Sequence, residues 1–310
     1  MTQWLSPPTL LLSMWSQAAG TATMAFVLAW FVSWFDGRVL ARLEGRRRRR
    51  NGLLGSLARA VADMVRVRSP RLWPTMVAVL SVLPALLLVA GMLHLVFALA
   101  FGAQMVATTN PGLLWWLAAL LGAAAANRWV LTCVWVGSSD LGRRRLLSGL
   151  TPWFGLWVAL SITMVGVGLV PGTFHPVATL VLIAMAGLWR RLEAQMHQPG
   201  ISASAGAAAQ ILAGMASHLA VTALILAAAA VSGLLLLLPT QPMLLAPGPL
   251  TAVLLLVVAA GVFLSRVCAV VLFSDPTPQR LRRFAWGGLL PLAGVEVVVS
   301  ALQLTQGMSQ

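Results

Sequence analysis

Lysine and tyrosine are absent from this 310-residue chain, and cysteine is almost absent. Two side chains that commonly handle protons in enzymes are therefore missing. Cys133 and Cys268 each stand alone inside an apolar stretch, without the paired spacing typical of zinc sites, iron–sulfur clusters or disulfides. We interpret both as small, buried, apolar side chains. The chain is thus expected to bind no metal, to hold no redox centre and to contain no catalytic residue of its own.

Carboxylates are scarce as well, since seven acidic residues face 21 basic ones and leave a formal charge of +14. Glu296 is the only carboxylate well inside a long apolar stretch. It is interpreted either as a proton-carrying or arginine-pairing group, or as a residue near the outer membrane interface or a subunit contact. The acidic residues are Asp36, Glu44, Asp63, Asp140, Glu193, Asp275 and Glu296.

Apolar residues dominate what remains. They make up 59% of the chain, charged residues make up 9%, and the mean hydropathy is +0.89. These values lie outside the range of soluble domains and predict an all-α integral membrane protein with one membrane domain over residues 1–310. A helical span needs about 20 apolar residues. Eight segments meet or approach that length: 11–35, 74–101, 112–136, 153–171, 174–189, 206–238, 243–273 and 284–304.

Every basic residue is an arginine, and most fall at 38–71, 143–145, 190–191 and 280–283, in alternate loops between the predicted spans. Because arginine-rich short loops stay on the cytoplasmic side, both termini are expected outside. Nucleic-acid binding requires a basic folded face, whereas these arginines flank apolar runs. We therefore expect contact with anionic lipid and no nucleic-acid partner.

Residues 52–68 have helical periodicity, with Leu53, Leu57 and Val61 on one face and Arg59 and Asp63 on the other. The pattern predicts an amphipathic helix at the membrane surface. It is either a lipid-facing anchor or the floor of a docking site for a soluble partner.

Residues 35–66 combine an acidic–arginine pair, a second acidic–basic pair and an Ala-Asp followed by a basic residue. These are Asp36 with Arg38, Glu44 with Arg46, and Asp63 with Arg66. The stretch resembles the first inner loop of the membrane-anchor family of complex I, the respiratory-chain NADH dehydrogenase. The membrane-bound nickel–iron hydrogenases share that family. Residues 137–150 and 273–294 are similar to two further loops of the same family.

The same resemblance shows departures from the family pattern. Carboxylate-rich segments of the family correspond here to the apolar PWFGLWVALS and to the short RRLEAQMHQPGISASAG, and its Arg-Gly-Pro turn is replaced by five arginines at 46–50. The chain looks like a divergent member that keeps the scaffold and has lost much of the proton and quinone chemistry.

The resemblance implies a non-catalytic subunit of a complex I-like or membrane-hydrogenase-like assembly in a bacterial or archaeal cytoplasmic membrane. Its implied partners are a soluble arm that carries iron–sulfur clusters and antiporter-like membrane subunits. A quinone is the one cofactor it suggests near the first inner loop, whose residues would form the docking surface and cavity mouth. Two alternatives stay open: a stand-alone transporter, and a scaffold of a complex that no longer transfers electrons.

Polar groups inside the predicted spans are the remaining candidates for proton transfer or ion pairing. Burying an arginine at mid-bilayer costs about 2.5–3.5 kcal/mol, so Arg128 and Arg266 should have partners or water. His94 and His218 are interpreted either as satisfied core residues or as functional groups. His175 and His197 lie near loops and indicate little alone. The candidate set is His94, Arg128, His218, Arg266 and Glu296.

Overall fold

The computed structural model describes residues 7–43, 45, 140–170, 173–196, 207–233, 247–272 and 277–308, and these ranges are almost entirely helical, with no strand. The predicted helical fold class is confirmed for this part of the chain. The predicted spans 74–101 and 112–136 and the amphipathic helix at 52–68 lie outside it. In chain order the elements are α1 (Pro7–Leu43), α6 (Asp140–Leu169), α7 (Pro176–Met196), α9 (Ala207–Val231), α10 (Pro247–Leu272), α11 (Pro278–Phe284), the π-helix η2 (Ala285–Leu289) and α12 (Leu290–Met308).

Three stretches of the described residues are long and apolar enough to cross a membrane: Thr151–Leu169, Ala252–Leu272 and Pro278–Gly307. A shorter apolar helix covers Ser217–Val231. The exposed side chains on these helices include Leu256, Val271 and Val298, each more than half exposed. Such surfaces suit contact with lipid acyl chains, so the described region has the composition of a helical membrane protein.

Helix ends differ from the predicted span ends. α6 begins at Asp140, so the arginines at 143–145 lie within the helix and not in a loop before it. α1 continues to Leu43, which places Asp36 inside that helix and not at its end. Arginine is a good helix former, so hydrogen-bonded helix continues after the apolar run has stopped.

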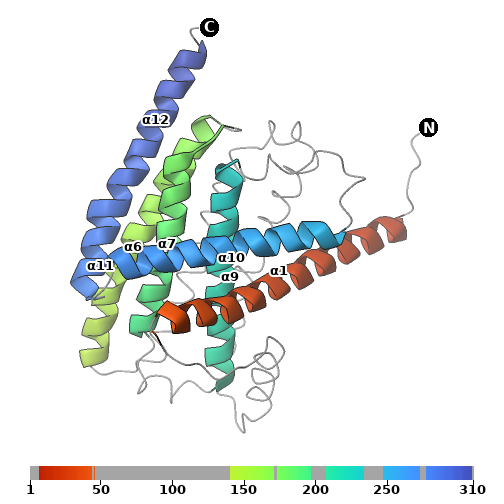
Figure 1. Ribbon diagram of the computed structural model, residues 1–310, viewed down its shortest axis with the longest axis horizontal. Helices are drawn as coiled ribbons and strands as arrows, with labels where there is room; N and C mark the ends of the chain where they lie inside the picture. Colours follow the sequence, from red (N-terminus) through yellow and green to blue (C-terminus); the bar gives the residue numbers. More distant parts are fainter. Residues whose placement is uncertain are drawn as a thin grey trace.

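α7 occupies the centre of the bundle and contacts α6, α9, α10 and α12. From Val181 to Trp189 its side chains are buried or half-buried on every face, as is typical of a helix segment with no solvent-facing stripe. α1 packs against α9 and α10. In Figure 1, α6, α7 and α12 run alongside one another, whereas α1 and α10 lie across α7 and α9.

Close helix contacts depend on glycine. A Cβ at Gly187 on α7 would lie 2.5 Å from the backbone oxygen of Ser265 on α10. A Cβ at Gly166 on α6 would lie 2.9 Å from Cγ of Glu296 on α12. These contacts are shorter than van der Waals separations, so both helix pairs need a residue without a side chain there.

A π-helical turn separates α11 from α12. At Leu290 the backbone N–H donates to the oxygen of Ala285, one residue further back than in an α-helix. The next residue is Pro291, which has no N–H and whose ring would crowd the preceding turn of an α-helix. The wider turn relieves that crowding and lets the helix continue through the proline.

Candidate functional site

A buried carboxylate joins three helices at one end of α7. Asp36 on α1 accepts hydrogen bonds from Nε and Nη2 of Arg266 on α10. Nη2 of Arg190 on α7 lies 3.5 Å from the second oxygen of the same carboxylate. All three side chains are about nine-tenths buried. We call Asp36, Arg190 and Arg266, with Ser217 and His218 described next, the arginine centre.

α9 completes the arginine centre. Nη1 of Arg190 donates to Oγ of Ser217 at 3.4 Å, and Nη2 of Arg190 contacts Nδ1 of His218. A guanidinium group can only donate, so Nδ1 of His218 is the acceptor and the ring proton sits on Nε2. His218 is therefore a neutral imidazole in this arrangement, assigned from its hydrogen-bond partner.

The arginine centre joins one carboxylate to two guanidinium groups. Removing charged groups from water costs several kcal/mol per ion, and bidentate pairing offsets much of that cost. The lone pairs of Ser217 and His218 supply the remaining acceptors for Arg190. The carboxylate is fully engaged, so the arginine centre is a structural joint and offers no free base.

Arg38 lies two positions after Asp36 but does not share its carboxylate. Its guanidinium carbon is 4.4 Å from the ring centroid of Trp34 on the same helix. This is a cation–π contact, favourable by about 0.5–1 kcal/mol at an exposed site. The sequence pair Asp36–Arg38 is thus two separate interactions: a buried ion pair between helices and a local stack within α1.

A second buried polar centre lies where α7 begins. Oε2 of Glu296 on α12 accepts the backbone N–H of Ala178 at 2.9 Å. Oε1 of Glu296 is 2.6 Å from Nδ1 of His175 and 3.2 Å from Oγ of Ser300. Glu296 is 1% exposed and His175 is 3% exposed. We call Glu296, His175 and Ser300 the histidine centre. Its carboxylate caps α7 at the end where the helix dipole favours negative charge.

The hydrogen bonds around His175 fix a proton in the histidine centre. Its Nε2 lies 3.1 Å from the backbone oxygen of Val170 and 3.1 Å from Oγ1 of Thr173. The carbonyl oxygen can only accept, and the Thr173 hydroxyl already donates to it, so Nε2 of His175 carries a proton. The opposite ring nitrogen faces Glu296, so a second proton is shared between the imidazole and the carboxylate.

The predicted residues fall into three groups in this structure. Arg266 has the partner that its burial required, and His218 lies in the same centre. Glu296 pairs with a histidine, not with an arginine, and is buried within the helical bundle. The candidates outside the described residues are Glu44, Arg46, Asp63, Arg66, His94 and Arg128.

Sequence reasoning misses two residues of these centres. His175 lies near a loop, yet it precedes Pro176 at the first position of α7. Proline favours that first position, so the residue before it stands where a capping group is needed. In the sequence, Arg190 is interpreted as one of the arginines that mark a cytoplasmic loop. A segment that is apolar on all sides precedes it in the same helix. Burial of an arginine beside such a segment is the signal that it has a partner.

Neither centre, nor any other part of the described chain, gathers three side chains that could hold a metal ion. The chain matches no protein-family model and no curated protein. The two buried centres and the sequence pattern around them are the features that indicate a function.

Proposed function

We propose that this chain is a non-catalytic, membrane-embedded subunit of a complex I-like or membrane-hydrogenase-like redox assembly. Its arginine-rich face would dock a soluble arm that carries the iron–sulfur clusters, and its helices would contact antiporter-like membrane subunits. The proposal includes eight spans, both termini outside, and a bacterial or archaeal cytoplasmic membrane. The supporting observation is the buried carboxylate of Asp36, which ties α1, α7 and α10 together.

Each of these three helices leads toward an arginine-rich segment. α1 ends at Leu43 with Arg42 in its last turn, and the run at 46–50 follows in sequence. α7 carries Arg191 directly after the buried Arg190, and α10 precedes the arginine-rich segment at 280–283. A joint between the helices fixes where these segments start relative to one another. A docking platform for a soluble arm needs such a fixed arrangement.

The proposed role involves no chemistry at the two centres. The Asp36 carboxylate is occupied by guanidinium groups, and Glu296 is occupied by His175 and a helix N-terminus. Reduction of a quinone requires free proton donors near its head group. A role without quinone, as in the hydrogenase branch of the family it resembles, therefore fits these residues better than a quinone site does.

A stand-alone transporter is the second candidate, and the histidine centre is the observation that favours it. A buried carboxylate and imidazole that share a proton are typical parts of intramembrane proton relays. The sequence shows neither an internal repeat nor a matching pair of broken helices. For these reasons the subunit role is preferred.

The deciding experiment is purification from native membranes in a mild detergent, with mass spectrometry of everything that accompanies the chain. Stoichiometric iron–sulfur and antiporter-like subunits are the expected result. A chain recovered alone, or only as its own oligomer, would overturn the proposal and direct work to transport assays.

Asp63→Ala tests the docking surface within that experiment. We expect the soluble arm to be lost from the purified complex while the membrane subunits stay together, because the substitution removes the one carboxylate of the predicted amphipathic helix. Glu193→Ala is the matched control, since it removes a carboxylate outside the predicted amphipathic helix and outside the first inner loop at 35–66. Wild-type stoichiometry of the arm in the Asp63 variant would refute docking through that helix.

A further inference from the structure

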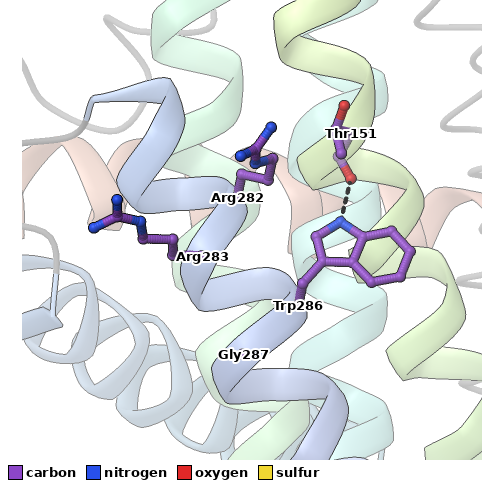
Figure 2. A pocket seen from close by; sticks show the side chains of 5 residues that line it. All are labelled: Thr151, Arg282, Arg283, Trp286 and Gly287. Carbon is purple, nitrogen blue, oxygen red and sulfur yellow. Dashed lines mark hydrogen bonds between the residues drawn. The ribbon is translucent and has the colours of Figure 1, made fainter.

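An open hollow of about 540 Å³ lies between α6 and the start of the last membrane-crossing stretch, lined by Thr151, Arg282, Arg283, Trp286 and Gly287. It belongs to neither polar centre. Figure 2 shows the Trp286 indole turned toward Thr151, with Arg282 and Arg283 projecting from the preceding helical turn.

The wall of the hollow is held in place by contacts between helices. Nε1 of Trp286 donates to the backbone oxygen of Thr151 at 3.0 Å. A Cβ at Gly155 on α6 would lie 2.8 Å from the same nitrogen, so the indole fits against bare backbone. Trp286 belongs to the π-helical turn, and such turns occur frequently at functional sites.

Positive charge in the hollow has no partner among the described residues. Arg282 and Arg283 are exposed, and neither side chain forms a hydrogen bond or ion pair within the described ranges. No carboxylate lines the hollow in this part of the chain. Two guanidinium groups on adjacent residues provide a dense set of N–H donors, which matches a phosphate group.

α12 follows the hollow in sequence and exposes apolar side chains. These side chains repeat every three or four residues, which places them on one helix face. They are Leu292, Val295, Val298, Val299 and Leu302. On α6, Phe154 is 55% exposed and its ring centroid is 6.0 Å from that of Trp286. Tryptophan and arginine are typical of the membrane interface, with apolar side chains deeper in the bilayer.

We propose that this hollow binds the phosphate of an anionic phospholipid, with an acyl chain lying along the exposed face of α12. Arg282 and Arg283 hold the headgroup, and the fixed Trp286 ring separates it from the hydrocarbon. The inference does not depend on the proposed redox assembly, because it uses only contacts within this chain.

The test is native mass spectrometry of the full-length protein, delipidated in detergent and titrated with phosphatidylglycerol or with phosphatidylcholine. The wild-type chain should retain phosphatidylglycerol preferentially. Arg282→Gln and Arg283→Gln should each weaken that binding about fivefold, and the double variant more strongly. Arg280→Gln is the control, since it removes the same charge from α11 outside the lining of the hollow and should change binding less than about twofold.

Three results would overturn the proposal. Equal retention of the two lipids would show that headgroup charge is not recognised. Equal weakening by Arg280→Gln would show general attraction to the basic segment. Displacement of phosphatidylglycerol by millimolar inorganic phosphate would show a free-anion site that does not use the acyl chain. Circular dichroism of each variant separates these results from misfolding.

Discussion

The two buried polar centres lie at opposite ends of α7 and bury charge in different ways. Arg190 and His175 are fifteen positions apart, which corresponds to about 22 Å along a helix. The arginine centre uses guanidinium groups, which stay charged at any physiological pH. The histidine centre uses an imidazole and a carboxyl group that share a proton. The first joins helices through ion pairs, whereas the second joins them through a carboxylate–imidazole hydrogen bond and a helix cap.

The arginine centre should be sensitive to loss of its carboxylate. Asp36→Ala leaves two buried guanidinium groups without their counter-ion, and breaking a buried pair in this way costs about 3–5 kcal/mol. Thermal unfolding of the purified protein in detergent measures the effect. The double variant Asp36→Leu with Arg266→Met should recover part of the loss. A single variant as stable as the wild type would show that the joint contributes nothing.

At the histidine centre, replacing Glu296 by a neutral polar side chain should cost less stability than replacing it by an apolar one. Glu296→Leu removes the acceptors of the Ala178 N–H and of His175, at about 1.5–3 kcal/mol for each charge-assisted bond. A glutamine at 296 can still accept from Ala178 and donate to the imidazole, so Glu296→Gln should cost less than half as much. Unfolding midpoints in detergent compare the two. Equal losses would show that the negative charge, and not hydrogen bonding, is what α7 requires.

One close glycine contact lies near each centre, and the two contacts differ in how closely an added Cβ would approach the neighbouring helix. Gly187→Ala, near the arginine centre, meets backbone of α10 and should cost about 1–3 kcal/mol in unfolding free energy. Gly166→Ala, at the histidine centre, would place Cβ 2.9 Å from Cγ of Glu296 and should cost less, because the approach at Gly187 is closer at 2.5 Å. Gly294→Ala is the control: it meets nothing within 4 Å and should be neutral or slightly stabilising. A larger loss for Gly166→Ala would reverse the ranking of the two contacts.

Arg38 should contribute least. Arg38→Gln removes its stack on Trp34 without touching Asp36, so the expected loss is about 0.5–1 kcal/mol. Chemical unfolding in detergent resolves a change of this size. A loss comparable to that of Asp36→Ala would mean that Arg38 also supports the joint.

Hydropathy predicts the helical segments well, because an apolar run must be helical in a bilayer whatever its neighbours. The segments at 174–189, 206–238 and 243–273 correspond to α7, α9 and α10. The same reasoning identifies Arg266 and Glu296 as groups that need partners. It does not identify the partners, since Asp36 and Arg266 are 230 residues apart and no local periodicity links them. His175 escapes sequence reasoning because its partner Glu296 is 121 residues away and reaches it only once α12 packs beside α7.

The central position of α7 has a consequence for biosynthesis. Glu296 is translated 121 residues after His175, and Arg266 is translated 230 residues after Asp36. During insertion the nascent chain therefore carries α7 with its first turn uncapped by Glu296 and with Asp36 bound at most by Arg190. Both ends are completed only when the final helices emerge from the ribosome. Packing of α10 and α12 thus completes the two centres, and a chain terminated before residue 296 would lack the carboxylate of the histidine centre.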